Sequence, residues 1–251
     1  MQSIKCDKPN MNPVTTGYVH SIYSGGMVDG PGIRCVVFLS GCPLRCKYCH
    51  NPDSWEKTSG KLMAVEEIMD EVLKYQKYYN ASGGGVTVSG GEPFMQAEFL
   101  TEILKACKHH RIHTAIDTSG YTSIDNAKKA LQYTDLLLLD IKAYNPETYR
   151  KVTGVNIDRT LEVLHLSLAL NIPTWVRYVL VPGLTDNMDE IKNLAEFLNG
   201  YSNVKKIDVL PFHKEGEYKW RNRNIPYELT DTPPPSPIMV DEAAKTLSRQ
   251  I

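Results

Sequence analysis

Three cysteines stand close together in the first fifth of the chain, at Cys42, Cys46 and Cys49, and His50 follows the last of them. Three thiolates with this spacing can converge on one metal centre. A structural zinc site normally takes four protein ligands, and the adjacency of Cys49 and His50 makes a tetrahedral grip awkward. A four-iron, four-sulfur cluster held by three thiolates leaves one iron open to another ligand. The spacing therefore favours an iron–sulfur cluster, with a zinc site completed by His50 as the alternative.

Apolar, β-branched runs alternate with segments of helical periodicity along the rest of the chain. Six such strand–helix units with short connections predict an α/β fold, and they are too few to close a standard eight-unit barrel. We therefore predict an open partial TIM barrel of about six parallel (βα) units. The predicted strands cover residues 34–39, 83–89, 114–117, 135–141, 174–181 and 206–210, preceded by a short strand at 17–24. The predicted helices cover residues 65–73, 96–109, 124–132, 146–152 and 159–170, a segment capped by Asp186 or Asn187, and 240–249.

Polar motifs follow the predicted strands at their carboxyl ends, which share one face in a parallel barrel. Gly90 and Gly91 would let a ligand lie against the backbone, because no Cβ holds it away. Asp117, Lys142 and Arg177 would form a site with both signs of charge, which suits a zwitterionic ligand. The alternative is a salt-bridge network that only closes the barrel end. The candidate residues at the strand ends are Gly90, Gly91, Glu92, Asp117, Thr118, Asp140, Lys142, Arg177 and His213.

A glycine-rich loop, residues 25–34, precedes the first barrel strand and carries Asp29. Four glycines and a proline in this loop indicate a shaped turn. Asp29 is either a turn residue whose side chain caps the backbone or a carboxylate held at the edge of the site.

Length and composition set the remaining limits. A chain of 251 residues with 42% hydrophobic residues is long enough for one sizeable core. The formal net charge of −1 implies no general attraction to nucleic acid or membrane. We predict an N-terminal arm at residues 1–16 and a single domain at 17–251. Six cysteines without a secretory signal indicate a reducing, cytoplasmic setting, in which Cys6, Cys35 and Cys107 are incidental or buried thiols.

The cysteine pattern resembles the signature of the radical S-adenosylmethionine (SAM) superfamily. More of the chain, from about Gly17 to Trp220, resembles the activating enzymes of glycyl-radical enzymes, and specifically the family that activates pyruvate formate-lyase. No cysteine lies between Cys49 and Gly90, unlike the activators that carry extra clusters there. The matching stretches are residues 28–34, 48–51, 80–86, 89–92, 117–120, 140–142, 177–178, 181–183 and 210–213.

The resemblance implies one 4Fe-4S cluster on Cys42, Cys46 and Cys49, and SAM bound at the iron that these three thiolates leave open. It implies a monovalent cation near Asp117 and Thr118, and places Asp29 beside the glycine loop of pyruvate formate-lyase. Flavodoxin or ferredoxin would supply the electron. A radical SAM enzyme for another glycyl-radical enzyme or a small molecule is the alternative, as is a non-enzymatic metal carrier. The implied contacts to SAM are Tyr48, Cys49, His50, Gly91, Asp140, Ile141, Lys142 and His213.

Overall fold

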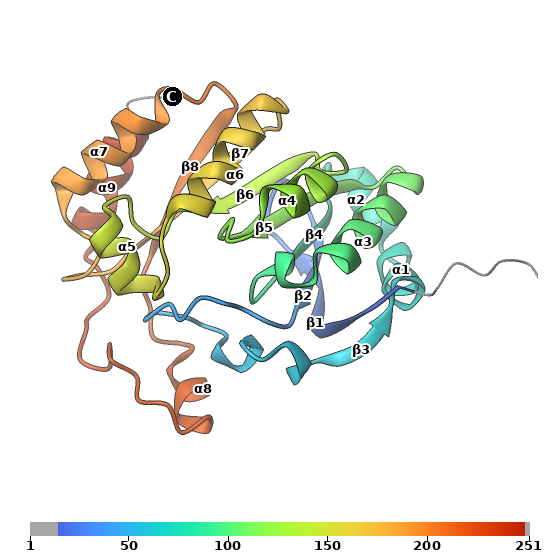
Figure 1. Ribbon diagram of the computed structural model, residues 1–251, viewed down its shortest axis with the longest axis horizontal. Coiled ribbons are helices and arrows are strands. Elements are labelled where there is room, and N and C mark those ends of the chain that lie inside the picture. The colour runs from blue at the N-terminus through green and yellow to red at the C-terminus, as the bar shows by residue number, and fades with distance from the viewer. Residues whose placement is uncertain (1–14, 249–251) are drawn as a thin grey trace, which may run out of the picture.

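One sheet of eight strands runs through residues 15–248, the part of the chain that the computed structural model describes, and most helices cover its outer side (Figure 1). The strand order is β3-β1-β2-β4-β5-β6-β7-β8. The strands are β1 (Thr16–Gly26), β2 (Arg34–Leu39), β3 (Lys61–Ala64), β4 (Gly85–Gly90), β5 (His113–Thr118), β6 (Leu136–Asp140), β7 (Thr174–Leu180) and β8 (Val204–Pro211). The helices are α1 (Val65–Leu73), α2 (Gln76–Ser82), α3 (Ala97–His109), α4 (Ile124–Leu131), α5 (Pro146–Thr153), α6 (Asp158–Ala169), α7 (Met188–Leu198), α8 (Glu217–Asn222) and α9 (Pro237–Ser248). Short 3₁₀ turns are η1 (Pro52–Ser54), η2 (Lys57–Ser59) and η3 (Pro93–Gln96).

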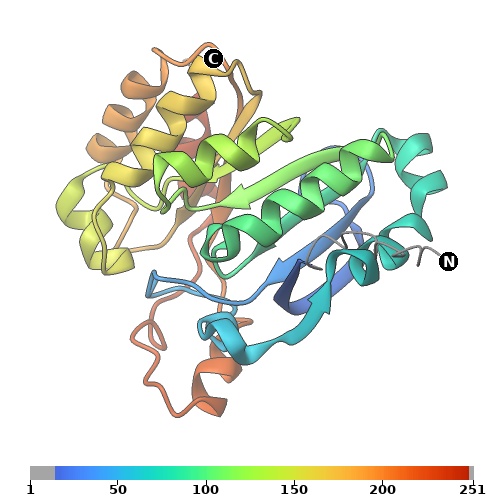
Figure 2. The ribbon, with the colours of Figure 1, turned by 45° about the vertical axis from the view of Figure 1, so that its right-hand side comes forward.

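Six of the eight strands, β2 and β4 to β8, pair in parallel, and this confirms the predicted open partial barrel. The sheet ends at β3 on one side and β8 on the other, so the barrel stays open between them. Figure 2 shows the curved sheet with the helices outside it. The prediction did not include β3, nor the antiparallel pairing of β1 with β2 and β3.

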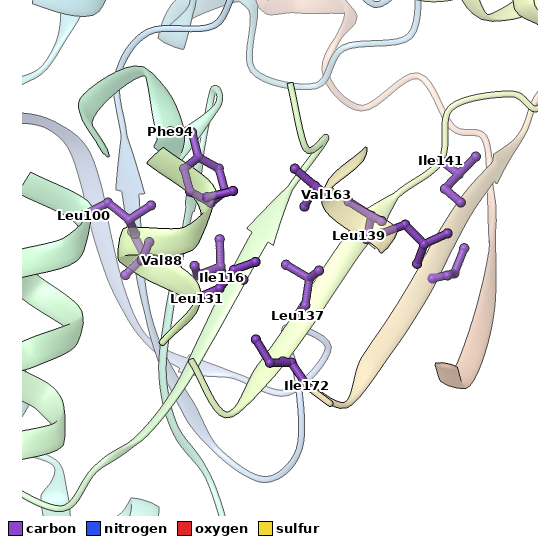
Figure 3. Packing of buried hydrophobic residues seen from close by; sticks show 14 of the residues in the cluster. Val88, Phe94, Leu100, Ile116, Leu131, Leu137, Leu139, Ile141, Val163 and Ile172 are labelled. Carbon is purple, nitrogen blue, oxygen red and sulfur yellow. The ribbon is translucent and has the colours of Figure 1, made fainter. Parts of the chain in front are cut away.

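The main core lies between the sheet and the outer helices. Figure 3 shows Ile116, Leu137 and Leu139 of the sheet on the side where Leu100 of α3 and Val163 of α6 pack. All five side chains are fully buried, and each contributes on the order of 1.5–3 kcal/mol through burial. Successive strand side chains point to opposite faces, so the residues between these apolar positions face the inside of the open barrel.

Helix positions follow the predicted pattern, with small differences at the ends. Asn187, one of the two predicted caps, accepts hydrogen bonds from the backbone of α7 at its first turn. The last helix begins at Pro237, earlier than predicted, because proline is tolerated in a first helical turn. α2 and α8 were not predicted.

The predicted arm lies almost wholly outside the described residues, and β1 already begins at Thr16. The division into an arm and one domain therefore stays a prediction. No helix within residues 15–248 is long and apolar enough to cross a membrane.

Candidate functional site

The loop with the three motif cysteines leaves the carboxyl end of β2 and is held by backbone hydrogen bonds from two sides. The Cys42 amide donates to the Trp55 carbonyl at 3.0 Å, and the Arg45 amide donates to the Thr153 carbonyl at 2.8 Å. Thr153 ends α5, where helix carbonyls have no partner within the helix. The loop amide thus satisfies a carbonyl at the end of α5, and the same hydrogen bond holds the loop against the helix.

α8 holds the same loop from the other side, and Figure 1 shows it beside the segment that follows β2. The indole Nε1 of Trp220 donates to the Cys49 carbonyl at 2.8 Å. The Trp220 ring meets the Trp55 ring edge-on, with 5.1 Å between centroids. Lys219 donates to the side-chain oxygen of Asn51 at 2.7 Å. This helix was not predicted; its one signal in the sequence is a tryptophan within a short polar segment.

The three motif thiols line a cavity of about 550 Å³ on the inner face of the sheet. Burial raises the pKa of Cys46 to about 12, against the opposing pull of Lys142, and it also raises the pKa values of Cys42 and Cys49. A buried thiolate is unfavourable unless a cation compensates its charge. The irons of a cluster supply such compensation, so the three thiols fit an iron–sulfur cluster.

His50 is already engaged elsewhere. Its ring lies against that of His213, with 4.1 Å between centroids, and its Nε2–H donates to the His213 carbonyl at 3.1 Å. Within residues 15–248, no three His, Cys, Asp or Glu side chains are arranged to hold a single metal ion. The Nε2 atom of His50 is therefore taken up by the hydrogen bond to His213.

The glycine turn after β4 packs against the start of the cysteine loop. A Cβ at Gly90 would lie 2.1 Å from the Leu39 carbonyl oxygen, and one at Gly91 would lie 2.4 Å from that of Gly41. Gly90 also has φ +131°, which residues with a side chain rarely adopt. Both glycines line the cavity. The turn thus needs glycine for its own packing, and that packing leaves backbone exposed to a ligand.

Glu92 is fully buried and does not line the cavity. Its carboxylate accepts hydrogen bonds from the Thr118 hydroxyl at 2.6 Å and the Ser119 amide at 2.9 Å, while its amide donates to the Gly41 carbonyl at 2.7 Å. Burial raises its pKa, although these hydrogen bonds oppose the rise. Glu92 joins the loops after β2, β4 and β5; its predicted contact with a cofactor stays a prediction.

Four charged side chains form a network on the cavity wall. Lys142 contacts Asp140 at 2.7 Å, and Arg177 contacts Asp117 at 3.0 Å and Asp140 at 3.9 Å. Burial disfavours the charge on Asp140, but Lys142 and Arg177 outweigh it and hold the Asp140 pKa below its ordinary value. Asp117 raises the pKa of Arg177 against burial. Asp140, Lys142 and Arg177 are therefore charged at neutral pH, and all four side chains line the cavity.

Asp29 reaches the cavity from the far end of β2. Its loop joins the antiparallel strands β1 and β2, so it starts at the opposite end of β2 from the cysteines. The Asp29 carbonyl accepts a hydrogen bond from the Thr87 hydroxyl on β4 at 2.6 Å, which brings the loop over the inner face. Burial and the nearby charge of Asp117 raise the Asp29 pKa.

The structure brings most of the predicted site residues to this one cavity. Ile141, like Glu92, does not line it: its side chain is buried and its amide donates to the Arg177 carbonyl at 3.0 Å. Several lining residues were not singled out, although alternation along the strands places some of them on the inner face. The predicted residues that line the cavity are Asp29, Cys42, Cys46, Tyr48, Cys49, His50, Gly90, Gly91, Asp117, Thr118, Asp140, Lys142, Arg177 and His213. The further lining residues include Phe38, Leu44, Ser89, Ser119, Val179, Leu210 and Phe212.

The chain is similar to known proteins over most of its length. The model of the Radical SAM superfamily matches residues 36–198. The pyruvate formate-lyase-activating enzyme of Clostridium pasteurianum is 46% identical over 215 residues, covering 86% of this chain and 90% of the relative. The pyruvate formate-lyase 1-activating enzyme of Escherichia coli (strain K12) is 45% identical, covering 87% and 90%. A crystal structure of a domain of pyruvate-formate lyase-activating enzyme from Bacteroides vulgatus superimposes with a TM-score of 0.56 at 26% identity, covering 66% of this chain and 94% of that one.

Proposed function

The chain belongs to the radical SAM superfamily and, within it, to the pyruvate formate-lyase-activating enzymes, and from this premise we propose that it generates a glycyl radical on pyruvate formate-lyase. The observation that carries the proposal is the single cavity in which three cysteine thiols, a glycine turn and a charged network meet. A small-molecule substrate or another glycyl-radical enzyme is the competing outcome of the test below.

The motif thiols would hold one 4Fe-4S cluster, and the cavity beside them would hold SAM. When bound, these groups supply an electron and a 5′-deoxyadenosyl radical, because one-electron reduction of the sulfonium splits it into methionine and that radical. The substrate glycine would lose one hydrogen atom from its Cα to the 5′-deoxyadenosyl group, which would leave as 5′-deoxyadenosine, and would keep the unpaired electron. Each turnover therefore consumes one electron and one SAM.

The charges of the cavity wall suit this ligand. Asp29, Asp117 and Asp140 face Lys142 and Arg177, which leaves one excess negative charge when all five are ionised. SAM carries a sulfonium, an ammonium and a carboxylate, and so one net positive charge. Lys142 can pair with the ligand's carboxylate and the aspartates with its cations.

We also propose a monovalent cation beside Asp117 and Thr118. The Asp117 carboxylate shares Arg177 with Asp140 and accepts a hydrogen bond from the Ser89 hydroxyl at 2.7 Å. A 4Fe-4S cluster on three thiolates would keep a net negative charge close to this wall, because its irons compensate the thiolates only in part. A small cation would offset that charge and bind oxygen ligands from the carboxylate and hydroxyl.

The substrate glycine would enter as an extended peptide through the open side of the barrel. A glycine within a folded partner cannot diffuse to the cavity, so its loop must be inserted. The carboxylate of Asp29 can accept hydrogen bonds from peptide amides and hold the Cα near the reacting carbon. His213 would contact SAM. Flavodoxin or ferredoxin would donate the electron to the cluster.

The test is anaerobic. Reduced, cluster-loaded protein is mixed with SAM and pyruvate formate-lyase, and the electron paramagnetic resonance spectrum is recorded. A glycyl doublet on the partner is expected, and it should be absent with the Cys46→Ser variant. SAM cleavage without any doublet on the partner would overturn the proposal and indicate a different substrate.

A further inference from the structure

The glycine-rich loop that carries Asp29 is wound around one buried side chain, Arg34. The Arg34 guanidinium donates to the Pro31 carbonyl at 3.4 Å, and its Nε donates to the Thr87 hydroxyl at 2.6 Å. The Thr87 hydroxyl in turn donates to the Asp29 carbonyl at 2.6 Å. Gly30 lies directly on the arginine stem, since a Cβ there would be 2.9 Å from Arg34 Cδ. The loop backbone is thus attached on both sides of Gly30.

Arg34 and Thr87 are fully buried and neither lines the cavity. Arg34 is also held from the sheet side, because its guanidinium donates to the backbone carbonyls of Val86 and His113. A buried arginine costs folding free energy unless its donors are satisfied. Simple filling of the barrel interior would need only an apolar side chain at this position. The donors that reach the loop therefore point to a role in placing it.

We propose that Arg34 and Thr87 are positioning residues that hold Asp29 at the cavity for the entering peptide. This inference rests on the proposed function, because it assigns Asp29 to the peptide. Neither residue touches the reacting groups; each acts through the backbone of the loop. We call the hydrogen bonds from Arg34 and Thr87 to the loop backbone the brace. Loss of the brace therefore moves Asp29, while the cysteine loop, which leaves the other end of β2, stays in place.

The test compares Thr87→Val with Thr87→Ser and with a matched control. Valine keeps the buried volume of Thr87 and removes the hydroxyl, whereas serine restores it. The control is Thr114→Val, the same change at another fully buried strand threonine, whose hydroxyl donates to the Tyr133 carbonyl at 2.7 Å and does not reach the loop. Both valine variants lose one buried hydrogen-bonding group, so a general loss of stability appears in both.

Two measurements decide the proposal. Amide hydrogen exchange of residues 25–33 should be about tenfold faster in Thr87→Val and unchanged in Thr114→Val. With a glycine-loop peptide, Thr87→Val should raise KM about five- to tenfold, while SAM cleavage by dithionite-reduced enzyme without peptide stays unchanged. Thr87→Ser should recover both values.

Equal behaviour of the two valine variants in exchange and in KM would overturn the brace. So would an equal loss of SAM cleavage and peptide reaction in Thr87→Val, because that is the result of a disturbed barrel interior. If the unaltered protein forms no glycyl radical, the proposed function fails; hydrogen exchange alone then supports the brace or refutes it.

Discussion

Replacing Lys142 by methionine separates the two interpretations of the charged network. The change keeps the chain length but leaves Asp140 with only Arg177, at 3.9 Å. The side chains of Lys142 and Asp140 are 14% and 19% exposed. Removing one partner of a fully buried pair costs about 3–5 kcal/mol. Because these groups border a cavity, water relieves part of that cost, and we expect about 2–3 kcal/mol.

The assay is thermal unfolding of the cluster-free protein, followed by SAM titration of the anaerobic, cluster-loaded protein. A loss of 2–3 kcal/mol lowers Tm by roughly 5–10 °C for a chain of this size. If Lys142 also pairs with the SAM carboxylate, losing that charge-assisted contact of about 1.5–3 kcal/mol weakens binding by roughly 10- to 150-fold.

Lys108→Met is the control, since Lys108 contacts Asp135 at 2.6 Å with side chains that are 41% and 31% exposed. Such a surface pair contributes at most about 1 kcal/mol. Equal Tm changes in the two variants would refute the assignment of the Lys142 pair as a buried, unscreened interaction. A lower Tm with unchanged SAM affinity would leave Lys142 as a barrel-closing residue only.

Three further predictions follow from particular contacts. Replacement of each motif cysteine by serine should lower the iron content per chain, whereas Cys107→Ser should retain it; full iron in a motif variant would contradict the ligand assignment. Trp220→Phe keeps an aromatic ring but loses the indole N–H that donates to the Cys49 carbonyl, so a chelator should remove iron severalfold faster. An unchanged rate would exclude Trp220 as a support of the loop. Burial and then the Arg34 charge lower the pKa of His113 in the folded protein. Between this lowered pKa and about 6.5, the unfolded chain therefore binds more protons than the folded one. The free energy of unfolding should fall as the pH drops through about 6.5 and level off below the folded pKa. His113→Gln should flatten this part of the Tm–pH curve, and an unaltered slope would rule His113 out as its source.

The parallel part of the fold was predictable because its signals are local. Each strand appears in the sequence as a short apolar run, and each outer helix appears as apolar residues with a 3.6-residue period. Because crossovers between parallel strands are right-handed, few topologies can join these elements. The strand β3 gave no such signal, because its four residues are exposed or half-buried. Its pairing with β1 depends on partners more than 40 residues apart, which a single sequence does not display.

The sequence predicts which residues lie near the site, but not which partners their side chains contact. Asp117 and Asp140 lie at the carboxyl ends of β5 and β6, and strand ends gather at one face. Glu92 belongs to the same motif as Gly91, yet its carboxylate is taken up by Thr118 and Ser119 from the next strand. That pairing is set by neighbouring strands in space. α8 was not predicted for a similar reason. Its six residues are too few to show helical periodicity, and the helix depends on contacts with the cysteine loop.

The two ends of β2 carry the two loops that the proposed function uses. The cysteine loop leaves its carboxyl end, and the Asp29 loop enters its amino end and folds back over the inner face. β2 is six residues long, roughly 20 Å of extended chain, and it pairs with β1 on one side and β4 on the other. A strand paired on both sides does not stretch. The separation between the motif cysteines and Asp29 is therefore set by the sheet, and under the proposed function we expect small changes in the reach of the substrate glycine to come from the loop around Arg34.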